Sequence, residues 1–150
     1  MFDDLRDLYQ EVILDHGRRP RHGTRLAAYD ATAKGDNPMC GDRVQVWVRH
    51  GADSRIAEAG FEARGCAISI ASADLMAEVL AGRSDAESRV LAQQFRNMAR
   101  TGECPDGDAA MERLRPLAGV HEYPSRVKCA TLPWHALLAA LDGKGDSSSE

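Results

Sequence analysis

The chain has 150 residues, about the length of one domain. Its 43% of apolar and 28% of charged residues exclude a mainly disordered chain, a fibre and a coiled coil. The 19 basic and 23 acidic residues give a net charge of -4, which argues against nucleic acid as a partner because phosphate binding needs a net basic surface or stripe.

Neither a membrane segment nor an export signal is expected. No window approaches the roughly 18 apolar residues that span a bilayer. The first 16 residues carry five acidic side chains and lack the positively charged start of a secretory signal. We therefore expect a cytoplasmic protein with no membrane partner. In that compartment thiols stay reduced, so disulfides are not the expected role of its four cysteines.

An amphipathic helix is predicted at the N-terminus. Apolar residues recur at helical spacing over residues 5–13, with Asp3 as the N-cap and Gly17 as the stop. A basic loop then runs from Arg18 to Arg25, where proline and glycine disfavour regular structure. This loop is either a solvated connection or a surface that docks an acidic partner.

Three strands are predicted next. The pattern suits a short strand over residues 27–34, which a Gly-Asp-Asn-Pro sequence breaks at 35–38. Valines alternate with other residues over 43–49, the period of a half-buried strand. A turn at 50–53 and another strand over 56–64 complete an antiparallel meander.

The remainder of the chain is predicted to be helical. Four helices are expected, over residues 68–80, from the Ser84 capping box to Gly102, over about 109–117 and over about 125–141. Pro133 should break or kink the last one. We expect a single α+β domain over residues 1–141, a three-stranded antiparallel sheet packed by about five helices, and a disordered tail over 142–150.

Three of the four cysteines lie at predicted element boundaries. Cys40 is at the entrance to a strand, two residues before Asp42, so both side chains would point to the same side. Cys66 is at a strand-to-helix junction, where the helix N-terminus stabilises a thiolate. Cys129 is expected at the start of the last helix. Cysteines that only fill the core are expected inside strands or helices.

The three thiols and the Asp42 carboxylate make four ligands, the number that tetrahedral Zn²⁺ takes. A carboxylate is a harder ligand than a thiolate, so Asp42 would be exchangeable, as in a reactive site. Arg126 and Lys128 would partly offset the negative charge. Because each cysteine is isolated in sequence, the residues alone leave both metal binding and apolar filling open.

The remaining candidate ligands show no such pattern. Cys104 lies in a Pro/Gly/Asp loop with no basic neighbour, and is expected to be an incidental exposed thiol. The five histidines are expected at the surface; they are His16, His22, His50, His121 and His135.

Three short segments carry a family resemblance. They are residues 37–42 (NPMCGD), 65–69 (GCAIS) and 126–132 (RVKCATL). In this order they resemble the three cysteine motifs of the IscU-like (NifU N-terminal-like) iron–sulfur cluster assembly proteins, and are most similar to its SufU branch. The resemblance extends from the first helix to about Leu141.

Two departures separate this chain from the IscU type. The residue before the third cysteine is Lys128, where IscU-type proteins carry histidine, and 63 positions separate Cys66 from Cys129. Both features are typical of SufU and weigh against a free-standing cluster scaffold.

The SufU resemblance implies a zinc protein that accepts sulfur from a SufS-type cysteine desulfurase, and activates it, rather than a stand-alone enzyme. The implied ligands are Cys40, Asp42, Cys66 and Cys129. A partner histidine would replace one cysteine on zinc, and Cys40 would attack the desulfurase persulfide. Arg126 would support the displaced site. Downstream cluster-assembly proteins would then receive the sulfur.

Two alternatives remain. One is a scaffold that assembles an iron–sulfur cluster on the same four ligands and transfers it. The other is a structural zinc module without sulfur chemistry.

Overall fold

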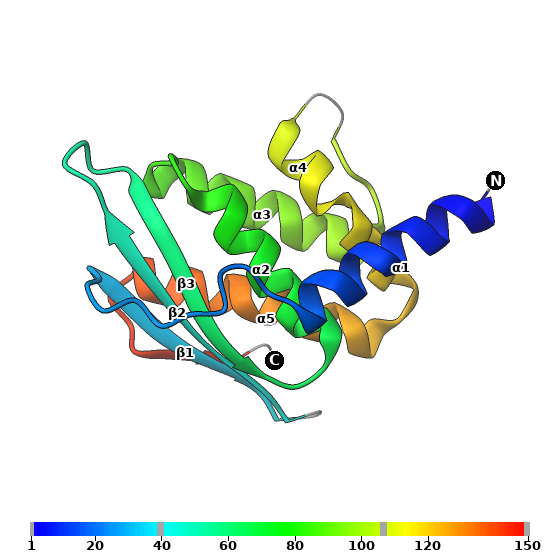
Figure 1. The fold of residues 1–150 in the computed structure, drawn as a ribbon, viewed down its shortest axis with the longest axis horizontal. Coiled ribbons are helices and arrows are strands. Elements are labelled where there is room, and N and C mark those ends of the chain that lie inside the picture. Colours follow the sequence, from blue (N-terminus) through cyan, green and yellow to red (C-terminus); the bar gives the residue numbers. More distant parts are fainter. Residues whose placement is uncertain (1, 39–40, 106–107, 149–150) are drawn as a thin grey trace.

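The computed structural model of the chain describes residues 2–38, 41–105 and 108–148. Its elements, shown in Figure 1, are α1 (Phe2–Arg18), β1 (Ala31–Asn37), β2 (Asp42–His50), β3 (Ile56–Arg64), α2 (Ala67–Leu80), α3 (Asp85–Thr101), α4 (Ala109–Leu114), the 3₁₀ helix η1 (Arg115–Glu122), α5 (Pro124–Leu141) and β4 (Asp146–Ser148).

The sheet has the strand order β3-β2-β1-β4. The first three strands form antiparallel pairs, with Val46 opposite both Ala33 and Phe61. This confirms the predicted three-stranded antiparallel meander. β4 adds a short parallel edge strand beside β1, which differs from the prediction of a disordered tail over 142–150. The edge of β1 supplies hydrogen-bond partners for this segment. For example, the Lys34 amide donates to the carbonyl of Gly145, just before β4, at 3.0 Å.

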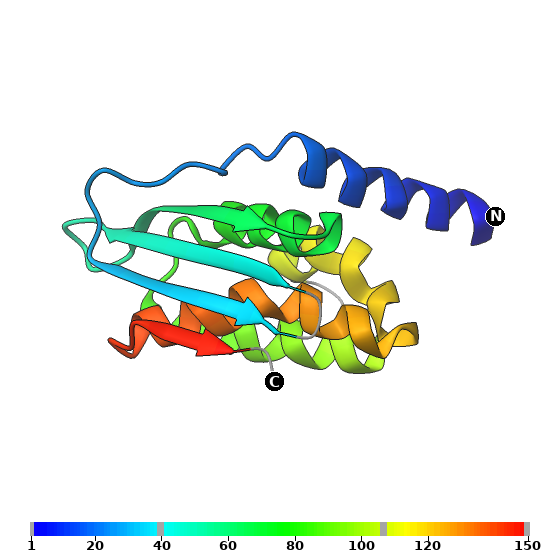
Figure 2. The ribbon, with the colours of Figure 1, turned by 90° about the horizontal axis from the view of Figure 1, so that it is seen from below.

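Helices cover one face of the sheet. α5 packs against β1 and β2, α2 packs against β3, and α3 packs against α5 (Figures 1 and 2). Side chains on alternate positions of β2, such as Val46 and Val48, join those of the helices in one buried cluster. Within it, the rings of Phe95 and Trp134 stack with centroids 4.7 Å apart. The five helices, like the sheet, agree with the predicted fold class.

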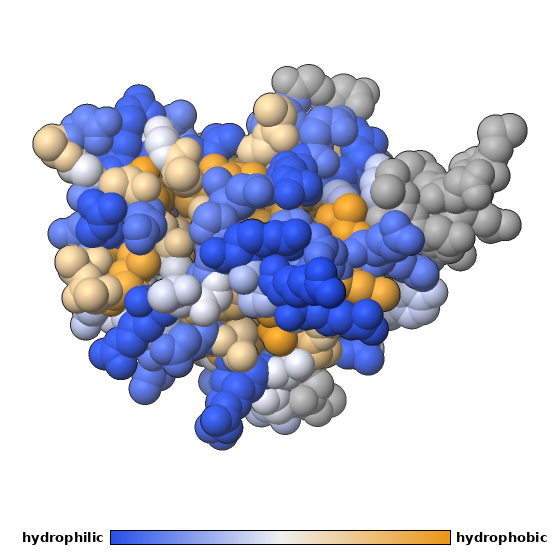
Figure 3. All heavy atoms as spheres, viewed as in Figure 1, coloured by the Kyte–Doolittle hydropathy of each residue, from blue (hydrophilic) through white to orange (hydrophobic). Residues whose placement is uncertain are grey.

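The opposite face of the sheet is partly covered by the chain that follows α1. Trp47 is only 1% exposed on this face, and the Arg25 guanidinium lies 5.6 Å from its ring centroid. The backbone passes so close that a Cβ on Gly60 would lie 2.2 Å from the Thr24 carbonyl oxygen, so this position requires glycine. Figure 3 shows mainly hydrophilic residues over the side of the molecule seen in Figure 1, with scattered hydrophobic ones.

Several element boundaries differ from the predictions. Residues 35–37, predicted to break the first strand, belong to β1 because β2 provides them with partners, such as Asp42 for Asn37. The predicted helix over about 109–117 ends at Leu114 and continues as η1, which has Pro116 near its start. α5 runs through Pro133 without ending there.

Candidate metal centre

Asp42 is the first residue of β2 and is buried. The chain returns beside it at Gly65, whose φ of +139° is unfavourable for other residues. A Cβ on Gly65 would lie 1.9 Å from Asp42 Oδ1. Glycine at this position therefore lets the end of β3 pass directly over the Asp42 carboxylate.

Cys66 occupies the N-cap position of α2, as predicted for a strand-to-helix junction. Its backbone N–H donates to Asp42 Oδ1 at 2.9 Å, and its thiol lies 3.6 Å from Asp42 Oδ2. No side chain of α2 caps its N-terminus, and its first turn has no acidic residue. The carboxylate from β2 instead meets the positive end of the helix dipole.

Cys129 lies in the second turn of α5. It is the sixth residue of α5, not a boundary residue, and is 1% exposed. Its thiol lies 3.6 Å from the Ser125 carbonyl oxygen, one turn earlier. α5 begins at Pro124, one residue before the predicted start at about 125, so the cysteine lies one residue further into the helix than expected.

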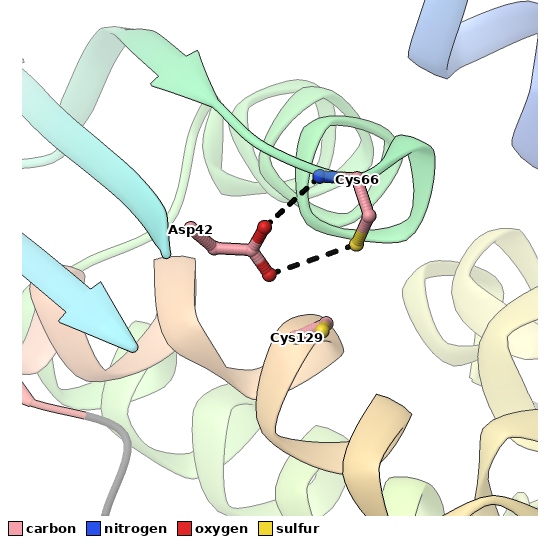
Figure 4. A group of neighbouring side chains, drawn as sticks. All are labelled: Asp42, Cys66 and Cys129. Atoms are coloured by element: carbon pink, nitrogen blue, oxygen red, sulfur yellow. Dashed lines mark hydrogen bonds between the residues drawn. The ribbon is translucent and has the colours of Figure 1, made fainter. Parts of the chain in front are cut away.

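The three side chains converge on one point. Ligand atoms of Asp42, Cys66 and Cys129 all lie within 4.8 Å of one another. Figure 4 shows Asp42, at the start of β2, and Cys66, at the start of α2, pointing toward each other, with Cys129 beside them on α5. Two thiols and a carboxylate at this separation suit Zn²⁺ or iron better than Mg²⁺ or Ca²⁺, which prefer oxygen ligands. Cys40, the fourth predicted ligand, lies outside the described residues.

Arg126 lies at the exposed edge of this group, one turn before Cys129. The pKa of its guanidinium is raised, first by a hydrogen bond with the Cys129 side chain and then by the negative charges of Cys66 and Cys129. Arg126 is thus placed to stabilise negative charge on these sulfurs.

Other predicted residues lie elsewhere. Cys104 is half-buried and its thiol lies 3.5 Å from the Met111 carbonyl oxygen, outside the group of converging ligands. In the basic loop, Arg21 pairs with Asp15 at 2.6 Å, which holds the pKa of that carboxyl below its usual range. With Arg25 placed over Trp47, two of the loop's arginines have partners in this chain.

Sequence reasoning was wrong about His16. The side chain is buried, and its Nδ1 hydrogen-bonds to the buried carboxylate of Asp74 in α2. The Arg113 guanidinium lies 3.3 Å from the other ring nitrogen. This pairing joins α1 to α2, and no local signal could reveal it because 58 positions separate His16 from Asp74.

Within residues 2–38, 41–105 and 108–148, this is the one set of three potential metal ligands that the geometry brings together. No helix in the same ranges is long and apolar enough to cross a membrane.

The chain is similar in sequence to known proteins. The model of the NifU-like N-terminal domain matches residues 8–130. The iron–sulfur cluster assembly scaffold protein IscU of Streptococcus pyogenes serotype M1 is 36% identical over 137 residues, which cover 91% of this chain and 84% of that protein. The zinc-dependent sulfurtransferase SufU of Bacillus subtilis is 34% identical over 134 residues, 89% of each chain.

A solved structure has the same fold. The crystal structure of a candidate iron–sulfur cluster assembly scaffold protein for the SUF system, from Fervidobacterium islandicum AW-1, superposes with a TM-score of 0.78 and 30% identity. The match covers 87% of this chain and 94% of that one.

Proposed function

The chain belongs to the family of the NifU-like N-terminal domain, and on that premise we propose that it accepts persulfide sulfur from a SufS-type cysteine desulfurase during iron–sulfur cluster assembly. We place this sulfur transfer in the cytoplasm, with downstream cluster-assembly proteins as the next recipients of the sulfur. The observation that carries it is the convergence of Asp42, Cys66 and Cys129 within 4.8 Å.

The proposed ligands of Zn²⁺ are these three residues and Cys40. Cys40 lies two residues before Asp42 in the sequence. The donor set fits the ion, since thiolates suit it and a single carboxylate is more easily exchanged. Bound Zn²⁺ would keep the thiols deprotonated near neutral pH.

Cys40 is the proposed sulfur acceptor. Its thiolate would attack the terminal sulfur of the persulfide on the desulfurase. A new S–S bond forms at Cys40 as the partner's S–S bond breaks, and the electron pair leaves on the partner's cysteine as a thiolate. The exchange needs no external oxidant or reductant.

The role proposed for Arg126 is electrostatic. Its guanidinium is exposed and interacts with the side chains of Cys66 and Cys129. It would compensate negative charge at the site while Cys40 is engaged in transfer. This assigns Arg126 a supporting role and leaves the nucleophile to Cys40.

A cluster scaffold is the second candidate. The similarity to the Streptococcus pyogenes protein, named as an IscU scaffold, favours it. An iron–sulfur cluster would then be cargo on the same four residues. Lys128 favours the first candidate, because the IscU-type motif that this chain resembles has histidine before the third cysteine, where this chain has lysine.

Anaerobic purification separates the two candidates. A colourless protein with about one zinc per chain supports the sulfur acceptor, whereas a brown protein with iron and labile sulfide supports the scaffold. The purified protein is then added to a SufS-type desulfurase with cysteine as substrate, and alanine production is measured.

We expect alanine production to rise severalfold with this protein and to stay at the basal rate with Cys40→Ala. Cys104→Ser is the matched control, a thiol deletion outside the converging group, and should stimulate like the unaltered protein. Full stimulation by Cys40→Ala would show that Cys40 is not the acceptor.

A further inference from the structure

One buried hydroxyl lies between two of the elements that form the candidate metal centre. Ser69, the third residue of α2, is 1% exposed. Its Oγ is 3.0 Å from Asp42 Oδ2 and 3.0 Å from the carbonyl oxygen of Cys129. A single side chain thus contacts the carboxylate from β2 and the backbone of α5.

Pro133 explains why the Cys129 carbonyl accepts a side-chain donor. In an α-helix this oxygen would accept the N–H of the residue four positions later, which is Pro133. Proline has no N–H, so the helix cannot supply that bond. The Ser69 hydroxyl stands where the missing donor would be.

A second serine of α2 repeats the arrangement one turn further along. Ser72 donates to the Ala130 carbonyl at 2.5 Å and accepts from Trp134 Nε1 at 3.2 Å. Ser72 therefore bonds the same segment of α5 as Ser69. Asp42 is hydrogen-bonded by Ser69 and not by Ser72.

The Asp42 carboxylate is held on both oxygens from α2. Oδ1 accepts the Cys66 amide at 2.9 Å, and Oδ2 accepts the Ser69 hydroxyl. Because one hydroxyl has one proton, Ser69 divides its donation between Asp42 and the Cys129 carbonyl. The orientation of the carboxylate is thereby linked to the backbone that carries Cys129.

We propose that Ser69 is a positioning residue. Its hydroxyl contacts both Asp42 Oδ2 and the Cys129 carbonyl, to which Pro133 cannot donate, and it thereby orients Asp42 toward Cys66 and Cys129. The expected effect of Ser69 on metal binding rests on the proposed function. Its effect on the orientation of Asp42 in the metal-free protein is independent of that function.

The first test uses metal-free protein and measures amide hydrogen exchange at Cys66 by NMR. Ser69→Ala should speed exchange at this amide, because a less constrained carboxylate accepts from it less of the time. Ser72→Ala, the matched control, should leave it protected. Equal exchange in Ser69→Ala and the unaltered protein would overturn the inference, whether or not the protein holds zinc.

The second test measures zinc affinity by competition with a chromophoric chelator. Loss of a hydrogen bond to a metal-ligating carboxylate weakens metal binding about tenfold or more, so Ser69→Ala should lose at least that factor. Ser69→Thr, which keeps the hydroxyl, should recover it. Ser72→Ala should lower the melting temperature with zinc affinity unchanged. Equal losses of affinity in both alanine variants would assign the serines to helix packing alone.

The third test separates stability from positioning with Pro133→Ala. This variant supplies the N–H that the Cys129 carbonyl lacks within the helix. Combined with Ser69→Ala, it should restore part of the melting temperature without restoring zinc affinity. Recovery of both would show that Ser69 acts only as a partner of α5.

Discussion

The N-termini of α2 and α3 begin in different ways. α3 is capped within its own sequence: the Ser84 hydroxyl accepts from the Glu87 amide at 3.1 Å, and the Glu87 carboxylate accepts from the Ser84 amide at 3.2 Å. α2 begins at Ala67, and the side chain of its N-cap residue, Cys66, makes no capping hydrogen bond. The backbone N–H of Cys66 instead donates to Asp42 of a distant strand. A helix start that is satisfied locally is structural, whereas one that recruits a carboxylate and two thiols is available for chemistry.

The largest effect is expected from adding a side chain at Gly65, where it would collide with the Asp42 carboxylate. Gly65→Ala would place a Cβ 1.9 Å from Asp42 Oδ1 at a φ of +139°. Strain and overpacking together should cost about 3 kcal/mol or more in the free energy of unfolding, measured with denaturant.

Gly82→Ala is the matched control for backbone strain. Its φ is +87°, but a Cβ there would meet nothing within 4 Å. We expect a loss of about 1–2 kcal/mol. Similar losses in the two variants would contradict the close approach of Gly65 to Asp42.

Removing the charge that caps α2 should have the next largest effect. Asp42→Asn keeps an oxygen acceptor but loses the anionic ligand, so zinc affinity should fall about tenfold or more in chelator competition. Asp36→Asn makes the same change at an exposed position of β1 and should leave affinity unaltered. An unaltered affinity in Asp42→Asn would remove this carboxylate from the site.

Removing the local cap of α3 should lower the stability of the fold without changing zinc affinity. Ser84→Ala should lower the free energy of unfolding by about 1 kcal/mol, because the Glu87 amide loses its acceptor. Ser84→Thr should retain most of the stability. Both variants should bind zinc like the unaltered protein, and a loss of zinc in Ser84→Ala would erase the distinction between the two helix starts.

The smallest effect is a pH dependence at the start of α3. His50 Nε2 lies 2.7 Å from Asp85 Oδ1, and this bond raises the pKa of His50 above its ordinary value near 6.5. Protonated His50 therefore stabilises the fold. The contribution is complete below pH 6.5 and disappears as the pH rises through the raised pKa.

Because the Asp85 side chain is 45% exposed, solvent weakens the pair and this contribution should stay within about 1 kcal/mol. Melting temperatures measured from pH 5 to 9 should show it, and Asp85→Asn should flatten the profile. A profile that keeps its slope in Asp85→Asn would assign the dependence to another group.

The two helix starts also show what the sequence could predict. The Ser84 capping box can be recognised in the sequence because its two residues are three positions apart. Cys66 was placed correctly at its junction, because glycine and a change of periodicity mark it. The bonds that assemble the centre join residues 24, 27 and 60 positions apart, and no local pattern encodes them. The role of Ser69 is therefore not predicted from the sequence. Pro133 indicates only that the carbonyl four residues earlier needs a donor from outside the helix.

X-ray absorption spectroscopy at the zinc edge of the purified protein tests the proposed ligand set directly. We expect three sulfur atoms and one oxygen around the zinc, from Cys40, Cys66, Cys129 and Asp42, with one sulfur fewer in Cys40→Ala. Cys104→Ser should leave the zinc ligands unchanged. A zinc site with nitrogen and oxygen ligands alone, or one that loses sulfur in Cys104→Ser, would show that these four residues are not the ligands.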